Sequence, residues 1–449
     1  MIEPKDFSEI DSQFESNVQA LRVFSQQIGE LADEHDRATI EQFTTGLEEW
    51  LAEWVGIDLT GTPDEEDTRV HNNVLETQTA SSSVKRESKS GENTSQNDAL
   101  VLPTSKTPMD EKMRRLVQDS DGARQLIECC RMFFRQSPTQ GTLLRRSALV
   151  ILVSYFELLL SDLIQSYYLR YPEALPSDKC VLSLSDLRGI GSIEEAERYL
   201  IAKEADKVLR KNLEDQLRYF SRCLKIDLEP LADCTSDLTE VDQRRNLLVH
   251  NNGMVNQIYL ARVPQSYIER TEIEEGQQIH VARKYLSNAI ETICIAGVIL
   301  IQQCWRKWEK EESEKADGAL TEHIYESLRE KRYTITIRLA EYGASLDFTT
   351  DHGSRLVTIN HAIALKEQGE LEEMDRVLSE RDWSSSATKF RLALHVLRNE
   401  EEATFELLPK AISIGEVDRQ ALEEWPLFRS LRASQRFIDV AERHFPATE

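Results

Sequence analysis

Residues 237–253 read DLTEVDQRRNLLVHNNG, and this stretch carries the most informative local pattern in the chain. Asp237, followed three residues later by Glu240, matches a capping box and predicts that a helix starts near Asp237. The run NNG at 251–253 predicts the end of that helix, because Asn and Gly tolerate the left-handed conformation that closes many helices. The stretch is therefore expected to form a short helix.

Three polar side chains, Arg245, Asn246 and His250, are expected in the last turns of this helix. Arg245 shares a helix face with apolar side chains, so it should be partly buried, which is costly for an Arg unless it is paired or functional. A helix C-terminus favours positive charge, and His exchanges protons near neutral pH, so His250 suits general acid–base chemistry. The Arg fork suits a phosphodiester and its developing negative charge.

Long apolar segments lie on both sides of this stretch. Residues 142–171 and 281–312 are expected to be long helices, residues 112–135 a further helix, and residues 182–229 two or three shorter ones. Polar and charged side chains interrupt both long apolar segments, so they are expected to be core helices and not membrane spans. Gly and Pro are scarce, at 17 and 12 residues. The chain is therefore predicted to be all-α, with an up-and-down helical bundle.

The pattern Arg245-Asn246-x-x-x-His250 resembles the R-N-x-x-x-H signature of the HEPN domain family. The apolar helix that contains Ser154-Tyr155-Phe156-Glu157 and the run RRNLLVHN at 244–251 look like those of stand-alone bacterial HEPN proteins. The resemblance covers roughly residues 111–310. It implies a HEPN-type helical bundle in that part of the chain.

The same resemblance implies a metal-independent endoribonuclease without a cofactor, working as a homodimer or higher homo-oligomer with two motifs in one composite site. The RNA 2′-hydroxyl would attack the adjacent phosphate, so DNA would not be cut. His250 would be the acid or base, Arg245 would hold the scissile phosphate, and Asn246 would orient His250. A toxin branch of the family continues the motif as H-x-Tyr, whereas this chain has His250-Asn251-Asn252, which weakens the expectation of an antitoxin that modifies that Tyr.

Glu157 is a candidate supporting residue on the apolar helix. With Ser154 and Ser161 it forms a polar stripe at helical spacing. The stripe either faces water or a second subunit, or Glu157 pairs with Arg245 and sets its orientation.

Two more side chains near the motif have two interpretations each. Arg244 is either a solvated charge or a second contact to the phosphate. Asn251, together with Asn252, is either part of the helix cap or a ligand. Elsewhere, His352 and His361 are nine residues apart with no Cys or acidic pattern around them, so no metal site is expected.

Outside the bundle, two amphipathic helices are expected within residues 6–56, and helix pairs in the C-terminal part. The first helices of the expected pairs, 354–368 and 388–398, start about 32–34 residues apart, close to the tetratricopeptide period; irregular helices are the alternative. The stretch TQTASSSVKRESKSGENTSQND is too polar to bury a core and predicts a disordered linker. The predicted domains are an acidic N-terminal helical segment (1–57), a polar linker (58–109), the HEPN-like bundle (110–312) and tetratricopeptide-like repeats (313–449).

The net charge of −25 is unevenly distributed. Residues 1–110 carry 23 acidic and 8 basic side chains, whereas residues 111–310 carry 28 of each. The field of the whole chain repels phosphate, so only the balanced middle segment is expected to offer a basic patch. Seven cysteines without a C-x-x-C pair, and a start that lacks a secretory pattern, predict a reduced, cytoplasmic protein with no membrane partner.

Two functions from different classes fit these patterns. The first is an RNA-cutting effector of antiviral defence or toxin type, whose C-terminal repeats bind a regulatory protein. The second is a non-catalytic HEPN dimer with helical repeats, which scaffolds partner proteins or binds nucleotides.

Overall fold

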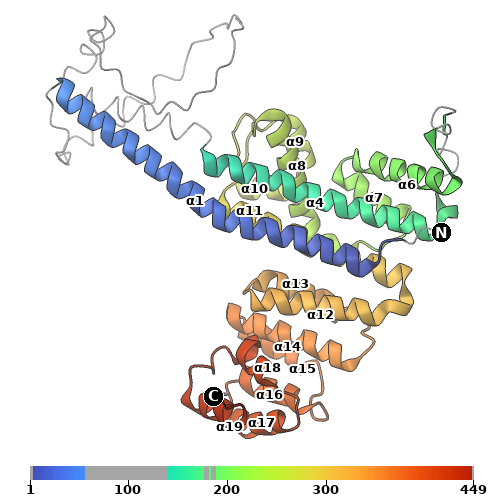
Figure 1. Cartoon of the computed structure of the whole chain (residues 1–449), viewed down its shortest axis with the longest axis vertical. Helices are drawn as coiled ribbons and strands as arrows, with labels where there is room; N and C mark the ends of the chain where they lie inside the picture. Colours follow the sequence, from blue (N-terminus) through green and yellow to red (C-terminus); the bar gives the residue numbers. More distant parts are fainter. Residues whose placement is uncertain (1–3, 56–138, 176–181, 184–188, 447–449) are drawn as a thin grey trace, which may run out of the picture. The chain divides into compact units, whose positions relative to one another are not determined.

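The computed structural model describes residues 4–55, 139–175, 182–183 and 189–446. Within these ranges the chain is helical, without a strand, and the β-type pairing is one isolated antiparallel bridge between Met254 and Gln278 (Figure 1). The prediction of an all-α protein is confirmed for this part of the chain. The expected linker (58–109) and the expected helix at 112–135 lie outside the described residues.

The helices follow one another along the chain with short connections. The first group comprises α1 (Phe7–Val55), α4 (Gln140–Arg170), α6 (Ile193–Leu209), α7 (Leu213–Arg222), α8 (Ala232–Asn251), α9 (Gln257–Arg262), α10 (Gln265–Thr271) and α11 (Arg283–Trp308). The second comprises α12 (Ser313–Arg329), α13 (Tyr333–Ala344), α14 (Asp351–Gln368), α15 (Leu371–Ser379), α16 (Thr388–Leu397), α17 (Glu401–Ser413), α18 (Arg419–Glu424) and α19 (Gln435–His444).

The chain divides into two compact units. One contains residues 1–29 and 144–449, and the other contains residues 30–143. In the second unit, the Asp36 carboxylate accepts hydrogen bonds from the backbone N–H groups of Gln140 at 3.1 Å and Gly141 at 2.8 Å. This carboxylate therefore caps the first turn of α4, where N–H groups lack partners inside the helix.

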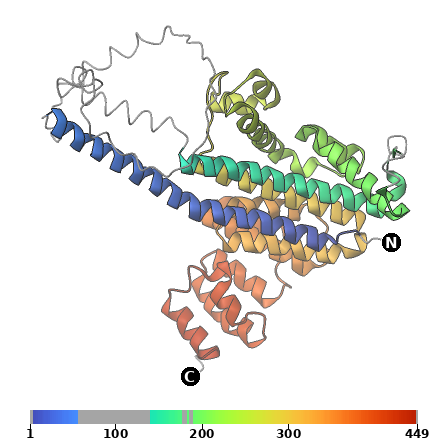
Figure 2. The ribbon, with the colours of Figure 1, turned by 45° about the horizontal axis from the view of Figure 1, so that its top comes forward.

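α4 and α11 form the centre of the first unit, and the first part of α1 runs alongside them (Figures 1 and 2). Both helices are long and apolar enough to cross a membrane by length and composition alone, and more than half of the most apolar window of each is buried in this fold. They belong to one core cluster together with side chains of α1, α12, α13 and α14. This core therefore crosses the boundaries expected near residues 57 and 312.

The expectation of two separate N-terminal helices is wrong, because α1 is one helix of 49 residues. Its first turns bury an apolar face against the core: Phe7, Ile10, Phe14, Val18 and Leu21. Phe7 stacks on Trp305 of α11 with ring centroids 5.6 Å apart. A Cβ atom at Gly297 would overlap the Phe14 ring, so α1 approaches α11 closely at a residue that has no side chain.

The predicted start of the motif helix is also wrong. α8 begins at Ala232, directly after a 3₁₀ turn at Glu229–Leu231, so Asp237 lies inside the helix and does not cap it. Pro230 fits the first turn of a helical segment because it has no N–H to satisfy there. The capping-box pattern was therefore a coincidence of spacing, since Glu240 is buried and binds elsewhere.

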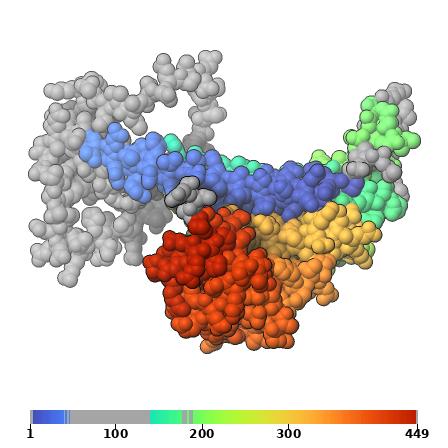
Figure 3. All heavy atoms as spheres, turned by 60° about the horizontal axis from the view of Figure 1, so that its bottom comes forward, coloured from blue at the N-terminus to red at the C-terminus, as the bar shows by residue number. Residues whose placement is uncertain are grey.

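The C-terminal helices pack as successive pairs, α12 with α13, α14 with α15 and α16 with α17, and Figure 3 shows them in gold, orange and red. The pair α12–α13 was not predicted. The first helices of the pairs begin at Ser313, Asp351 and Thr388, which gives spacings of 38 and 37 residues. These spacings exceed both the predicted 32–34 residues and the tetratricopeptide period, so the structure shows helix pairs and does not confirm that repeat type.

Candidate functional site

The end of α8 is closed as the sequence predicted. Asn252 adopts the left-handed conformation (φ 50°) and Gly253 follows at φ 80°. A Cβ atom at Gly253 would lie 2.8 Å from the carbonyl oxygen of Ile279, so this position requires glycine. The side chain of Asn251 donates a hydrogen bond to the backbone carbonyl of Met254, and Arg146 donates to the Asn252 side chain at 2.8 Å. Both asparagines therefore contribute to closing the helix.

The three motif side chains, Arg245, Asn246 and His250, line one cavity of about 540 Å³ beside the last turns of α8. Asn251 lines it as well. The cavity is bounded by α8, by the end of α6 with the turn that follows it, by α9, and by Glu157 of α4. Arg245 is half-buried and His250 is exposed, so a ligand in the cavity has access to both.

Arg245 is held by two carboxylates through one nitrogen atom. Its Nη2 lies 2.5 Å from Glu157 Oε1 and 3.2 Å from Asp242 Oδ1. The Glu157–Arg245 pair that the sequence suggested is therefore present. Arg245 Nε is buried and has no hydrogen-bond partner among the described residues. The guanidinium thus retains donor capacity that its neighbours do not use.

Asp242 is a site residue that the sequence reasoning missed. Its buried carboxylate also accepts hydrogen bonds from Asn246 Nδ2 at 3.3 Å and Gln243 Nε2 at 2.9 Å. Burial raises the pKa of the Asp242 carboxyl, and the Arg245 guanidinium partly offsets that rise. Asp242 precedes Arg245 and Asn246 by three and four residues, a spacing that brings helical side chains together, so the sequence held this signal.

Arg244 has a different environment from the one expected. Only 6% of Arg244 is exposed, so the interpretation as a solvated charge is wrong. Its Nε donates to Glu240 Oε1 at 2.7 Å, Nη1 donates to the carbonyl of His280 at 3.1 Å, and its guanidinium lies 3.9 Å from the Tyr285 ring centroid. Arg244 does not line the cavity beside Arg245. Its contacts are those of a buried structural ion pair.

Glu240 is the acidic partner in that network, and it also accepts hydrogen bonds from the hydroxyls of Tyr259 at 2.7 Å and Tyr285 at 2.6 Å. Burial, together with the charge of Glu240, raises the pKa of both tyrosines. Burial likewise raises the pKa of Tyr267, to about 12. The tyrosines therefore stay neutral donors, and the network links α8 to α9, α10 and α11.

Three exposed basic side chains line the same cavity as the motif: Arg210, Lys211 and Arg262. Arg210 pairs with Asp206 at 2.7 Å, but both side chains are well exposed, so this pair is weak. These cations come from α6, the turn after it and α9, which are separated in sequence from the motif. Sequence reasoning placed a basic patch within residues 111–310, and the structure locates positive charge beside the motif.

The described residues contain no group of three or more His, Cys, Asp or Glu side chains arranged to hold a metal ion. The described cysteines, Cys223, Cys234, Cys294 and Cys304, are free thiols. Comparison of the chain with protein-family models, with curated proteins and with solved structures gives no match in any of the three.

Proposed function

We propose that this chain is a metal-independent endoribonuclease that cuts RNA through attack of the 2′-hydroxyl, with its active site in the cavity lined by Arg245, Asn246 and His250. The observation that carries the proposal is that these three side chains share a cavity of about 540 Å³ with the cations Arg210, Lys211 and Arg262. A cavity of that size takes a small ligand or part of a polymer, and its basic rim suits a phosphate backbone.

In the proposed reaction, His250 removes the proton from the 2′-hydroxyl, whose oxygen then bonds to the adjacent phosphorus. The bond from phosphorus to the 5′-oxygen breaks, and that oxygen takes up a proton as it leaves. The products are a 2′,3′-cyclic phosphate end and a 5′-hydroxyl end. Arg245 stabilises the charge that develops on the phosphoryl oxygens. The Arg245 side chain lines the cavity, and Glu157 and Asp242 restrict its orientation.

The protonation of the leaving oxygen calls for a second acid. We propose that it is His250 of a second copy of the chain, which completes a composite site as the HEPN resemblance implies. His250 is exposed at the end of α8, where a second subunit can reach it. Light scattering should therefore show a dimer or a larger species, and a strictly monomeric active enzyme would contradict the composite site.

The activity is tested with the purified full-length chain and bulk RNA in the presence of EDTA. We expect fragments with 2′,3′-cyclic phosphate ends, and we expect Arg245→Ala and His250→Ala to lower their rate of formation by at least a hundred-fold. Arg419→Ala and His35→Ala are matched controls, because both side chains are exposed and lie outside the cavity. If wild type and both site variants give the same fragments, the assignment fails and a binding scaffold replaces it.

The biological role that we propose is an effector of antiviral defence or toxin type, with the C-terminal helix pairs (residues 313–446) binding a regulatory protein. Growth of cells that express the wild-type chain is compared with growth of cells that express His250→Ala. Arrest by the wild type alone supports the role. Equal arrest by both would assign the toxicity to something other than RNA cutting.

A further inference from the structure

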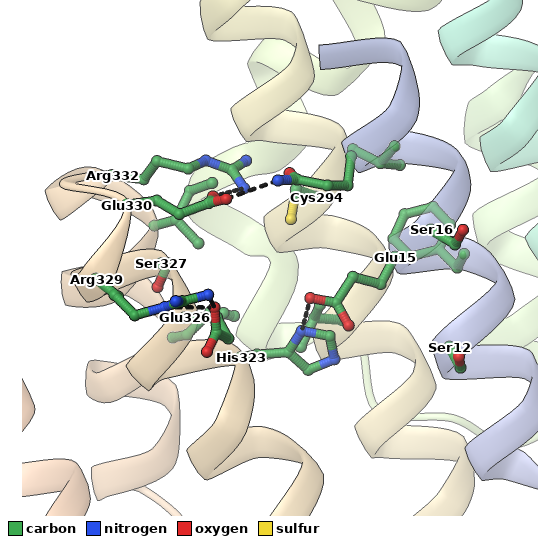
Figure 4. Close-up of a pocket in the computed structure, with 16 residues that line it drawn as sticks. Ser12, Glu15, Ser16, Cys294, His323, Glu326, Ser327, Arg329, Glu330 and Arg332 are labelled. Carbon is green, nitrogen blue, oxygen red and sulfur yellow. Dashed lines mark hydrogen bonds and ion pairs between the residues drawn. The ribbon is translucent and has the colours of Figure 1, made fainter. Parts of the chain in front are cut away.

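A second cavity, of about 320 Å³, lies within the unit formed by residues 1–29 and 144–449. Side chains of α1, α11, α12 and α13 line it (Figure 4). The motif side chains of α8 do not contribute to it. It is therefore a site separate from the proposed ribonuclease centre, and the inference below stands without that function.

The two polar walls of this cavity differ in chemistry (Figure 4). The α1 wall presents hydrogen-bond acceptors: the carboxylate of Glu15 and the hydroxyls of Ser12 and Ser16. The opposite wall, from α12 and the turn into α13, presents the guanidinium groups of Arg329 and Arg332. The same wall also carries the carboxylates of Glu326 and Glu330, so a ligand between the walls meets acceptors on the α1 side and guanidinium groups among carboxylates on the other.

Most of the charged groups around the cavity are already paired. Arg329 Nη2 lies 2.5 Å from Glu326, and Glu330 accepts from Arg22 at 2.7 Å and from Gln19 at 2.6 Å. The two partners of each pair neutralise one another, so these pairs add little net charge to the cavity.

Two groups on opposite walls remain poorly paired. Arg332 Nη2 is buried and has no hydrogen-bond partner among the described residues, and the ion pair of Arg332 with Glu330 is long, at 3.6 Å. Glu15 lies 3.7 Å from His323, whose ring is held more closely by Asp11 at 2.9 Å. Burial raises the pKa of the Glu15 carboxyl, and His323 offsets part of the rise. Arg332 therefore has a long ion pair with Glu330 and one unsatisfied nitrogen, and Glu15 lacks a close cation.

The floor of the cavity is apolar and fully packed: Phe14, Val18, Val298, Ile335 and Leu339. Such a floor favours an alkyl or aromatic body on the ligand. A singly charged anion would face the carboxylates of Glu15 and Glu330, and a singly charged amine would face Arg332. A ligand with both charges satisfies both walls.

We infer that this cavity binds a small zwitterion, an amino-acid-like molecule whose carboxylate pairs with Arg332, whose ammonium pairs with Glu15, and whose apolar body rests on the floor. Such a ligand bridges α1 to the turn between α12 and α13, and it therefore ties the N-terminal helix to the first of the C-terminal helix pairs.

The test is calorimetric titration of the full-length chain with four six-carbon probes: L-leucine, 6-aminohexanoate, hexanoate and hexylamine. In leucine both charged groups are attached to the same carbon, whereas in 6-aminohexanoate they stand at opposite ends of the chain. Comparing the affinities of these two probes therefore indicates how far apart the two charged walls lie. We expect at least one zwitterion to bind at least ten-fold more tightly than both singly charged probes. If none binds, or if hexanoate or hexylamine binds as well as the zwitterions, the inference is wrong.

The variants Glu15→Gln and Arg332→Gln are each expected to lower the affinity for the zwitterion at least ten-fold. Glu9→Gln and Lys331→Gln are matched controls, because they remove the same charges from exposed neighbours on α1 and beside Arg332. Far-UV circular dichroism verifies that each variant folds, and Glu15→Gln tests the site even if Arg332→Gln unfolds, because the Glu15 side chain is half-exposed. Unchanged binding in a folded Glu15→Gln would overturn the proposed ammonium contact.

Discussion

Arg244 and Arg245 are neighbours on α8, and their surroundings differ sharply. Arg244 is buried, with Glu240, a backbone carbonyl and tyrosine side chains around its guanidinium. Arg245 is half-buried at the cavity, where one nitrogen holds two carboxylates and Nε has no partner among the described residues. A buried charge with a full set of partners is part of the structure, whereas a partly satisfied charge beside a cavity is available to a ligand.

The largest effect on stability is expected from Arg244→Ala. Removing one partner of a buried pair leaves Glu240 as an uncompensated buried charge, which costs about 3–5 kcal/mol. Arg245→Ala should cost less, about 1–2 kcal/mol, because the Arg245 side chain is 21% exposed and Asp242 keeps its hydrogen bonds to Gln243 and Asn246. Urea unfolding followed by circular dichroism measures both. If the two variants lose the same free energy of unfolding, Arg244 and Arg245 do not differ in structural role.

A smaller effect, on RNA cutting, is expected from Glu157→Gln. The 2.5 Å ion pair to Arg245 becomes a neutral hydrogen bond, so the guanidinium is held less firmly and kcat should fall about ten-fold. The unfolding free energy should change by less than about 1 kcal/mol, because both side chains are partly exposed. If Glu157→Gln changes neither cutting nor stability, Glu157 does not position Arg245.

Asp242 links stability to pH on the cavity side of α8. Burial raises the pKa of Asp242 in the folded chain above its unfolded value. Between about pH 4 and the raised pKa, the folded state therefore binds more protons than the unfolded state does. The free energy of unfolding contributed by Asp242 should therefore fall across that window. Asp242→Asn should remove this part of the pH dependence. Unfolding curves of both proteins between pH 3.5 and 7 give the difference, and parallel curves would contradict the assignment.

The smallest effects are expected from the basic rim. Lys211→Ala and Arg262→Ala should each weaken RNA binding a few-fold, and each should lower the slope of log affinity against log salt by about 0.7. Arg419→Ala is the control, because this exposed side chain lies outside the cavity. An unchanged salt slope in both rim variants would show that RNA does not contact Lys211 and Arg262.

Local patterns in the sequence predicted most helices well. The long apolar helices were expected at 142–171 and 281–312 and are observed as α4 (Gln140–Arg170) and α11 (Arg283–Trp308). The helix stop at Asn252-Gly253 was also predicted correctly, because its signal is carried by the backbone preferences of two residues. Such features depend on neighbours within a few positions.

Features that depend on distant contacts were missed. The start of α8 was misplaced because Glu240, which resembled a capping residue, is bound by tyrosines of α9 and α11. Arg244 looked solvated because nothing in its local sequence shows the three helices that cover it. The helix pair α12–α13 was missed, since the helix pairs expected from the sequence start only at residue 354.

Gly297 makes the packing of the N-terminal helix against α11 sensitive to a single substitution. The Phe14 ring rests against the backbone of α11 at Gly297, where a Cβ atom would overlap two of the ring carbons. Exchanging a single hydrogen for a methyl group at that point would force the Phe14 ring to shift and would disturb the packing of α1 on α11. Gly297 does not line the cavity beside α8, so the substitution would change none of the residues that line it. The packing of the first helix on α11 thus depends on the absence of one carbon atom at residue 297.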